Sequence, residues 1–593
     1  MRKLRALISR LTVLSCFCAS CLPIVKQILP MHSIVANAED TEEVVTSGTC
    51  GENLTWNFEQ SIGTLTISGT GAMENWNEQK SCWYHLHEDI KEVIIEDGVT
   101  TIGSYAFMFC KSLTSVTIPN SVTAIETYAF NNCRALTAIT IPDSVTAIGM
   151  GAFFGCSALT SVTIPNSVIV IGNVAFQLCG SLESVTIPKS VTTIGGYVFD
   201  GTPWLETQKN KNPLVIINNI LIDGTTYDQE ELIIPDGMTT IGDGAFEGCA
   251  SITSVTIPDS VTVIGNAAFQ LCGSLESVTI PESVTTIGGW AFNSCSALES
   301  ITIPENITAI GEKAFIDTPW LETKRNENPL VMINGILIDG VTCENDIVIP
   351  DSVTTIVGSA FYNCKSLTSV TIPDSVTTIG NSAFYGCESL TSVTIPDSVT
   401  AIECSTFQDC KSLISVTIPA NVTTIEEWAF FDCSALESIV ISDSVITIER
   451  YAFNGCTALE SIVIPDNVTT IGNGTFYRCE SLTSVTIENP ACEIFDNKYT
   501  ISNTATIYGY DNSTAQVYAE TYRRNFVSLG TAPASAPTDT STIWNGISPD
   551  MNGDGRIDAS DASLVLIFAA EYGAGNVKNF GDFMEKHQTE FSS

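Results

Sequence analysis

The sequence predicts a repeat solenoid that is mainly β with short helical turns, followed by a small helical module at the C-terminus. Phenylalanine recurs with a spacing of 23 residues, interrupted by one jump of 47 and one of 46, which corresponds to about 17 coils. A unit of this length cannot bury its own apolar face, so stacked units have to build one continuous core. The repeated phenylalanines are residues 107, 130, 153, 176, 199, 246, 269, 292, 315, 361, 384, 407, 430, 453 and 476.

One regular coil covers residues 367–389 and contains three short apolar segments. The first, over 367–372, alternates apolar and polar residues, which predicts a strand with one buried face. Pro373 ends this strand, because proline has no N–H to donate to a central ladder. The second segment is 376–379, and the Ala, Phe and Cys within 383–387 are spaced for one face of a brief helical turn.

The first 38 residues have the composition of a secretory signal peptide. They contain five basic residues and no acid, an apolar run from Leu11 to Leu22, and the small-x-small sequence Ala36-Asn37-Ala38. The apolar run is shorter than the roughly 20 residues of a membrane-spanning helix, so a transmembrane anchor is the less favoured alternative. Val13–Cys16 weakly resembles a lipoprotein box, which leaves lipidation as another alternative. We therefore expect an exported protein without a transmembrane anchor.

The rest of the chain is strongly acidic. After residue 38 it carries 20 basic and 66 acidic residues, a formal charge of −46. Nucleic acid and anionic membrane surfaces are poor partners for such a protein. Only 15% of all residues are charged and 44% are hydrophobic, which indicates a folded chain. Three histidines remain after residue 38, and this scarcity disfavours histidine-based catalysis.

The motif L-x-x-V-x-I-P-x-x-V-x-x-I-G-x-x-A-F-x-x-C fits nearly every coil and resembles the BspA-like leucine-rich repeats of bacterial surface proteins. The segment from Cys50 to Trp83 is similar to the leader that precedes such arrays. The resemblance implies a leucine-rich-repeat solenoid, a secreted or cell-surface location, and binding rather than catalysis. The expected parts are a signal peptide (1–38), a leader or N-terminal cap (39–89), a solenoid (90–487) with atypical coils near 200–235 and 316–350, a C-terminal cap (488–530), a linker (531–542) and a C-terminal module (543–593).

Thirteen of the 18 cysteines after residue 38 occupy one repeat position, three residues after the phenylalanine. An exported protein with many cysteines invites a disulfide interpretation. Stacked copies, however, should lie about 4.8 Å apart, farther than the Cβ separation of about 3.8 Å that a disulfide prefers. We expect buried free thiols that act as small apolar residues. Cys50 and Cys82 flank the leader, and a disulfide between them stays open.

Two features of the coils are candidate binding surfaces. Lys209, Lys211, Lys324 and Arg325 lie within the two atypical coils and form a local excess of positive charge for an acidic partner, unless these segments are merely solvated loops. The position two residues before the phenylalanine is often aromatic, and such a row could stack on sugars or a peptide, unless the rings only pack between coils. The aromatic residues of this row are Tyr105, Tyr128, Tyr197, Trp290, Trp428 and Tyr451.

A calcium-binding loop is the most specific motif of the C-terminal module. Its oxygen ligands stand at loop positions one, three, five, seven, nine and twelve, and Gly555 allows the sharp turn at position six. Such hard oxygen donors suit Ca²⁺. The segment after the loop, 564–571, predicts an exit helix. The six ligands are Asp550, Asn552, Asp554, Arg556 through its carbonyl, Asp558 and Asp561.

The segment before the loop contains Trp544, Gly546 and Pro549 and cannot form the entry helix of an EF-hand. A loop with an exit helix alone resembles a dockerin, the module that docks onto cohesins of cellulosome scaffolds. The resemblance implies that Ala559 and Ser560 help to select the partner. Dockerins usually hold two such loops, and one is recognisable here, so the segment resembles a half or degenerate dockerin, which puts tight conventional docking in doubt.

These features favour a secreted, non-catalytic binding or adhesion protein that docks through calcium onto a cohesin scaffold, in the context of polysaccharide catabolism. The first alternative is a free extracellular adhesin with a calcium-stabilised tail. The second is a polysaccharide-degrading enzyme, because most dockerin-bearing proteins are enzymes. Against it, the expected parts leave no room for a catalytic domain, and neither G-x-S-x-G nor H-E-x-x-H occurs.

Overall fold

A computed structural model describes residues 45–76 and 81–532 of the chain. The predicted signal peptide, almost all of the linker, and the dockerin-like module lie outside these described residues. The chain divides into two compact units after Ser47, and the fold described below belongs to the second unit, Gly48–Ser593. None of the helices in the described residues is both long and apolar enough for a membrane span.

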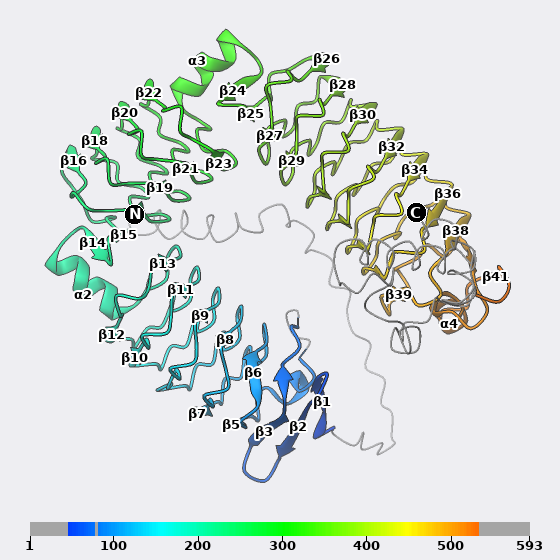
Figure 1. Ribbon diagram of the computed structural model, residues 1–593, viewed down its shortest axis with the longest axis horizontal. Coiled ribbons are helices and arrows are strands. Elements are labelled where there is room, and N and C mark those ends of the chain that lie inside the picture. Colours follow the sequence, from blue (N-terminus) through cyan, green and yellow to red (C-terminus); the bar gives the residue numbers. More distant parts are fainter. Residues whose placement is uncertain (1–44, 77–80, 533–593) are drawn as a thin grey trace, which may run out of the picture. The chain divides into compact units, whose positions relative to one another are not determined.

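The second unit contains a β-solenoid of about 19 turns with few helices (Figure 1). The predicted solenoid is therefore confirmed, and it has more turns than the roughly 17 expected from phenylalanine spacing, because a turn without that phenylalanine precedes the series and another follows it. The additional turns contain β4 (Gly71–Ala72), which pairs with β6 (Val99–Ile102), and β39 (Glu493–Ile494), which pairs with β37 (Thr470–Ile471).

Each regular coil but one contributes a first strand that carries the S-V-T or a related sequence, and in the remaining coil Ala138 forms a single parallel bridge to Ser161. These strands pair in parallel, and each residue lies beside its own copy in the next coil, as in Ser161↔Ser184 and Ser277↔Ser300. The first-side strands are β3 (Thr64–Gly69), β5 (Glu92–Ile95), β7 (Ser115–Thr117), β10 (Ser161–Thr163), β12 (Ser184–Thr186), β16 (Glu231–Ile233), β18 (Ser254–Thr256), β20 (Ser277–Thr279), β22 (Ser300–Thr302), β26 (Asn345–Val348), β28 (Leu367–Thr371), β30 (Ser392–Thr394), β32 (Ser415–Thr417), β34 (Ser438–Val440), β36 (Ser461–Ile464), β38 (Ser484–Ile487) and β40 (Thr506–Gly509).

A second strand follows in each coil, and in most coils it is shorter than the first and comes after the proline. It too pairs in parallel with the next coil, as in Ile356↔Ile379. The second-side strands are β4 (Gly71–Ala72), β6 (Val99–Ile102), β8 (Ala124–Ile125), β9 (Ala147–Ile148), β11 (Val170–Ile171), β13 (Thr193–Ile194), β15 (Ile220–Asp223), β17 (Thr240–Ile241), β19 (Val263–Ile264), β21 (Thr286–Ile287), β23 (Ala309–Ile310), β25 (Ile336–Asp339), β27 (Thr355–Ile356), β29 (Thr378–Ile379), β31 (Ala401–Ile402), β33 (Thr424–Ile425), β35 (Thr447–Ile448), β37 (Thr470–Ile471) and β39 (Glu493–Ile494).

The third side of each coil differs from the brief helical turn that the A-F-x-x-C spacing predicts. The structure has a series of tight turns here, in which alternate N–H groups donate to the next coil. Around Phe384, the N–H of Ser382 donates to Cys404 O (2.9 Å), that of Phe384 to Thr406 O (2.9 Å), and that of Gly386 to a third carbonyl. Because these N–H groups point along the solenoid axis, they cannot close the i→i−4 bonds of an α-helix.

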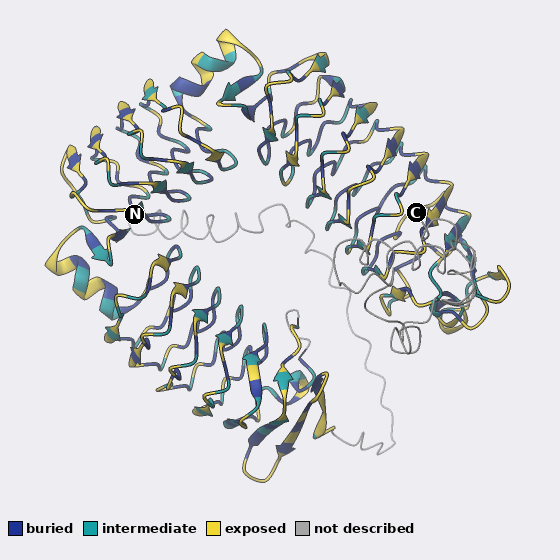
Figure 2. Cartoon of the chain, in the orientation of Figure 1, coloured by how far each residue is buried: buried dark blue, intermediate teal, exposed yellow. Residues whose placement is uncertain are grey.

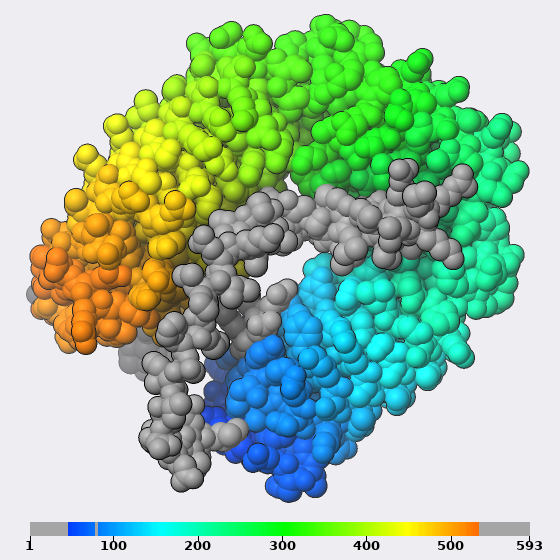
Figure 3. All heavy atoms as spheres, turned by 180° about the vertical axis from the view of Figure 1, so that it is seen from behind, coloured from blue at the N-terminus to red at the C-terminus, as the bar shows by residue number. Residues whose placement is uncertain are grey.

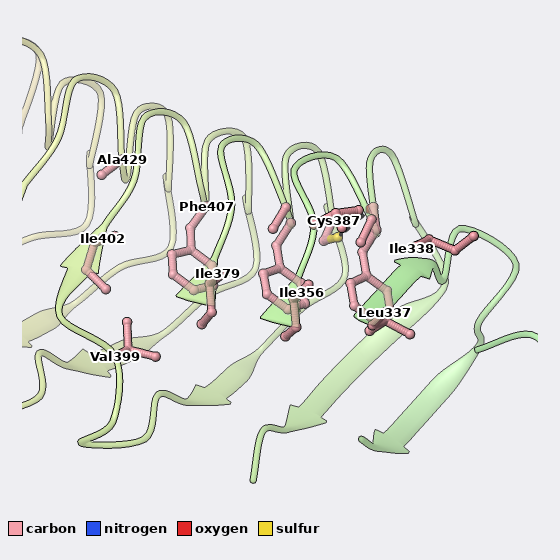
Figure 4. Close-up of a cluster of buried hydrophobic side chains, with 14 of the residues drawn as sticks. Leu337, Ile338, Ile356, Ile379, Cys387, Val399, Ile402, Phe407 and Ala429 are labelled. Carbon is pink, nitrogen blue, oxygen red and sulfur yellow. Dashed lines mark hydrogen bonds between the residues drawn. The ribbon is translucent and has the colours of Figure 1, made fainter. Parts of the chain in front are cut away.

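The repeated phenylalanines form the centre of the core, where they are buried and stack face to face. Phe384 and Phe407 are typical, with ring centroids 5.4 Å apart and an interplanar angle of 5°. Figure 4 shows Ile356, Ile379 and Ile402 as a second column beside the phenylalanines, and Figure 2 shows that buried and exposed residues alternate along the coils. Stacking thus buries what a single coil leaves exposed.

The leader closes the N-terminal end of this column. It contains β1 (Ser47–Gly51), β2 (Leu54–Glu59), which is antiparallel to β3, and the 3₁₀ turn η1 (Tyr84–Leu86). The fully buried Trp83 stacks on Phe107 with centroids 5.5 Å apart, and its indole N–H donates to Ala106 O (2.7 Å). Trp83 therefore occupies the place that a preceding phenylalanine would fill.

The two atypical coils replace the phenylalanine turn by a helix and a β-hairpin. The helices are α2 (Pro203–Lys211) and α3 (Pro319–Glu327), and the hairpins pair β14 (Val215–Ile217) with β15 and β24 (Val331–Ile333) with β25. Each helix starts with an N-capping threonine followed by proline, a combination that favours helix initiation. The solvated loops considered from sequence are therefore ordered elements.

The C-terminal end of the array is covered by α4 (Thr514–Thr521) and β41 (Phe526–Ser528). β41 pairs with β40, so the first-side ladder continues to Ser528. Tyr518 of α4 donates its hydroxyl to Asn497 O (2.9 Å) and accepts from Ile501 N (3.1 Å), which fastens the helix to the loop before it.

Candidate functional site

The structure places the predicted aromatic row at one repeated position of the third side. All six side chains are half-buried, and their backbones lie in the left-handed region, with φ between 53° and 58°. Tyr105 and Tyr128 have ring centroids 5.3 Å apart, and those of Trp428 and Tyr451 are 6.3 Å apart with nearly parallel planes. The row therefore consists of these two adjacent pairs and the single residues Tyr197 and Trp290, separated by coils whose residue at this position is not aromatic.

Several of these rings also pack between coils. A Cβ added to Gly151 would overlap the ring of Tyr128, one added to Gly244 would lie 2.5 Å from Tyr197, and one added to Gly474 would lie 2.5 Å from Tyr451. Each of these tyrosines thus covers a glycine of a later coil. One part of each ring therefore packs against another coil, and the part that faces solvent is available to contact a ligand.

Arg450 adds a cation to the aromatic group of Trp428 and Tyr451. Its guanidinium lies 5.1 Å from the centroid of a Trp428 ring and pairs with Glu427. This group combines two aromatic rings, a cation and a carboxylate on neighbouring coils. It is the densest part of the predicted platform.

The positive residues of the atypical coils do not form the exposed patch considered from sequence. Lys209 Nζ lies 2.8 Å from Asp223 Oδ2, and Arg325 Nη2 lies 2.6 Å from Asp339 Oδ2. Both cations are largely buried, with side-chain exposures of 5% and 11%, so they hold the helix against the hairpin. Of the other two, Lys211 is exposed, and Lys324 is half-buried and pairs with Glu327 (2.8 Å).

Regular coils on either side of an atypical coil contact each other directly, because the phenylalanine turn between them is missing. Tyr197 donates its hydroxyl to Glu247 (2.9 Å) across the first atypical coil. Ser359 donates to Glu312 (2.9 Å) across the second. Burial raises the pKa values of Tyr197 and Glu312 above their ordinary values, as expected for groups enclosed between coils.

The cysteines form a ladder of buried free thiols. All 18 cysteines in the described residues are free, including Cys50 and Cys82, so the disulfide left open between these two is absent. Ten thiols of the ladder donate to the carbonyl of a phenylalanine in the preceding coil, as Cys387 Sγ does to Phe361 O (3.2 Å). Burial raises the pKa of Cys295 to about 12 and that of Cys479 to about 12. Thiols held in this protonated form are poor nucleophiles.

The structure cannot place the predicted calcium ligands Asp550 to Asp561, or Ala559 and Ser560, because they lie outside the described residues. Within residues 45–76 and 81–532, no group of three or more His, Cys, Asp or Glu residues is arranged to hold a metal ion. Calcium binding by the C-terminal loop stays a prediction.

Sequence reasoning missed the left-handed backbone at the aromatic row. The same position carries Gly151, Gly244 and Gly474 in other coils, and all three have positive φ. Recurrent glycine among otherwise variable residues was the available signal. It also explains why the row is interrupted, since the backbone geometry and not the aromatic character is common to all coils.

Residues 79–206, 223–334, 341–456 and 423–522 match a family profile described as BspA type leucine rich repeat region, six copies. A leucine-rich repeat protein from Bacteroides ovatus is 27% identical over 78% of this chain and 99% of its own, with a TM-score of 0.31. A leucine rich cell surface protein from Faecalibacterium prausnitzii is 26% identical over 78% and 97%, with a TM-score of 0.26. The pneumococcal vaccine antigen PcpA is 17% identical over 81% and 98%, with a TM-score of 0.28. No curated protein matches the chain.

Proposed function

This chain belongs to the BspA-type leucine-rich repeat family, and we propose that it is a secreted, non-catalytic binding protein whose solenoid presents a surface for a protein or glycan. The family consists of leucine-rich repeat surface proteins. The signal-peptide composition of residues 1–38 supports export of this chain.

The observation that carries this proposal is the variable position on the third side. Its backbone conformation is the same in every regular coil, whereas its side chain ranges from glycine to tryptophan. The aromatic members are half-exposed, whereas small members such as Ser405 and Ala267 are buried. A fixed backbone frame with variable side chains at regular intervals is the arrangement by which solenoids build extended binding surfaces. Aromatic rings contribute large contact areas there at low entropic cost.

The chemistry of the buried groups supports binding rather than catalysis. The most numerous candidate nucleophiles are the cysteines of the ladder, which donate to main-chain carbonyls and have raised pKa values. The half-buried carboxylates Asp243 and Glu312 accept hydrogen bonds from Asn266 and Ser359 of other coils. These thiols and carboxylates form hydrogen bonds that connect one coil to another.

The group around Trp428 gives the direct test of the binding surface. Fluorescently labelled protein would be incubated with bacterial cells and with a glycan array, and the bound fraction measured. We expect Trp428→Ala combined with Tyr451→Ala to reduce binding at least about tenfold, the effect of losing about 1.4 kcal/mol of contact energy. Tyr362→Ala is the matched control, because that ring is also half-buried but occupies a different repeat position. Equal binding by both variants would contradict the proposed role of the row.

We propose further that the C-terminal loop binds Ca²⁺ and docks the protein onto a cohesin-bearing scaffold. The support is the ligand spacing in the sequence from Asp550 to Asp561. Calorimetry of the full secreted chain against a cohesin panel should show binding with calcium, loss with a chelator, and loss in Asp550→Ala/Asp554→Ala. Calcium binding without affinity for any cohesin would instead favour the free adhesin with a calcium-stabilised tail.

A hydrolysis assay addresses the remaining alternative, a polysaccharide-degrading enzyme. The full secreted chain would be incubated with plant polysaccharides, and reducing ends measured. We expect no release above a heat-denatured control. Steady release of reducing sugar that is lost on substitution of a carboxylate pair would contradict the non-catalytic assignment.

A further inference from the structure

A pocket of about 470 Å³ lies where the regular coils end. It is lined by the turn after Phe476, by residues of the 498–504 loop, and by Arg524, which follows α4. The pocket exists because no further phenylalanine turn stacks on the turn of Phe476. Its volume falls within the roughly 300–1,000 Å³ that is usual for small-ligand sites.

The lining of this end pocket is cationic in a strongly acidic protein. Arg478, Lys498 and Arg524 line the pocket together with one carboxylate, that of Glu480, and Arg478 also interacts electrostatically with Asp432. The whole chain has 25 basic against 66 acidic residues. Three of its few cations are therefore gathered at one pocket, where they favour an anionic group.

Two tyrosines expose ring surface at the same pocket. Tyr477 and Tyr499 are 39% and 47% exposed, and their ring centroids lie 4.9 Å apart at an interplanar angle of 64°. Lys498 Nζ lies 4.8 Å from the centroid of Tyr499. The repeated phenylalanines of the core are buried, so these exposed rings offer stacking surface that the core does not need.

Two N–H donors at the pocket lack an acceptor within the described part of the chain. In the regular coils, the main-chain N–H two residues after the phenylalanine donates to a carbonyl of the following coil, as Gly455 N does to Tyr477 O (2.8 Å). Arg478 holds this position after Phe476, and no regular coil follows to supply a carbonyl for its N–H. Arg524 Nε is buried and also has no acceptor, although its Nη2 donates to Lys498 O (2.5 Å). Of the two, Arg524 Nε is buried, and an unmatched buried donor is costly, so a ligand oxygen at this place would satisfy it.

We infer that the end pocket binds a carboxylate-bearing sugar residue of an acidic polysaccharide. The planar guanidinium groups suit the two oxygens of a carboxylate, and the exposed tyrosine rings suit the apolar face of a sugar. A single negative charge per sugar is tolerated, whereas a densely charged polymer is repelled by the acidic remainder of the protein. This inference rests on the proposed binding function and names the ligand class of one site.

The probe is tri-galacturonic acid, titrated calorimetrically into the full secreted protein at low ionic strength. Its methyl ester is the matched neutral ligand, with the same rings and no charge. We expect the acid to bind, the ester to bind at least about tenfold more weakly, and added salt to weaken the acid selectively. Absence of binding, or equal binding of acid and ester, would overturn the inference.

Variants locate the site. Arg524→Gln and Tyr499→Ala should each weaken tri-galacturonate binding about tenfold, which corresponds to the loss of one charge-assisted or stacking contact. Lys365→Gln removes an exposed cation elsewhere and should leave binding unchanged. Because Arg524 also holds Lys498 O, its substitution could loosen the cap, and Lys498→Gln, with an unchanged melting temperature, keeps the test independent of folding. Unchanged binding in Lys498→Gln and Tyr499→Ala would reject this pocket.

Further results distinguish a sugar-selective pocket from a general anion site, and the end pocket from the aromatic row. Competition by inorganic phosphate as strong as by tri-galacturonate would reveal an anion site without sugar selectivity and would overturn the assignment. If cell or glycan binding depends on Trp428 and Tyr451 but tri-galacturonate does not bind, only the end-pocket inference fails. If tri-galacturonate binds while the aromatic-row variants have no effect, the proposed function of the row fails and the pocket stands.

Discussion

At the scale of single residues, the repeat position determines the role more than the residue type does. Cysteine appears as a small core residue that donates to a carbonyl, although an exported protein would suggest disulfides. Tyrosine, valine, lysine and serine all adopt a left-handed backbone two residues before the phenylalanine. The ladder of hydrogen bonds to the next coil imposes this conformation. In residues other than glycine it is unfavourable, because Cβ then lies close to the following carbonyl oxygen.

The strain is largest where the residue is β-branched, as at Val174 with φ of 52°. We expect Val174→Gly to raise the free energy of unfolding by about 0.5–1 kcal/mol, because relief of the left-handed strain exceeds the entropic cost of glycine. Chemical denaturation measures this change. Gly151→Ala is the reverse control and should destabilise, since its Cβ would overlap the Tyr128 ring. Destabilisation by Val174→Gly would show that the valine side chain contributes more packing than strain.

At the scale of elements, the atypical coils exchange one kind of support for another. Each loses its turn of the phenylalanine column and gains a helix whose tryptophan packs on the last phenylalanine, with Trp320 4.9 Å from Phe315. Each helix is then tied to its hairpin by a buried ion pair. In the second atypical coil the ion pair has a second hydrogen bond, in which Arg325 Nε donates to Asp339 Oδ1 (2.9 Å).

Breaking this ion pair from one side should be costly. Arg325→Met leaves the buried carboxylate of Asp339 without its partner, and we expect a loss of about 3–5 kcal/mol. The double variant Arg325→Met/Asp339→Leu should recover most of that loss, because no charge then stays buried. Thermal unfolding of the three proteins checks this order. Lys324→Met is the control, since its pair with Glu327 is partly exposed and should contribute about 1 kcal/mol or less. Equal losses in the single and double variants would contradict the argument.

At the scale of the whole molecule, the described chain behaves as a stack of interchangeable coils. The strand pairings connect each residue with its own copy one coil away. Figure 3 shows neighbouring coils as contiguous bands of colour. Stability is then a sum over coils and their interfaces, and removal of a whole coil changes one term of that sum.

Removal of one regular coil should therefore be tolerated. Deletion of residues 371–393 removes 23 residues and joins Val370 to Thr394 in the same repeat register. We expect a folded, soluble protein with a melting temperature within about 5 °C of the parent. Deletion of 371–382 is the control and should prevent folding locally, because strands and turns would then face the wrong partners. Circular dichroism and limited proteolysis distinguish the two, and similar proteolysis of both would contradict an interchangeable stack.

The sequence by itself determined the solenoid, its period and its buried free thiols. A 23-residue repeat leaves no other way to bury the column from Phe107 to Phe476, so these properties follow from spacing alone. Tertiary structure decided what spacing cannot express. Whether the turn at Phe384 becomes helical depends on carbonyls supplied by the next coil. Whether Arg325 is an exposed charge or part of a buried ion pair depends on the carboxylate of Asp339, which is 14 residues away in the sequence and lies beside it in the fold. The end pocket, likewise, exists only because Tyr477, Tyr499 and Arg524 meet where the stack ends.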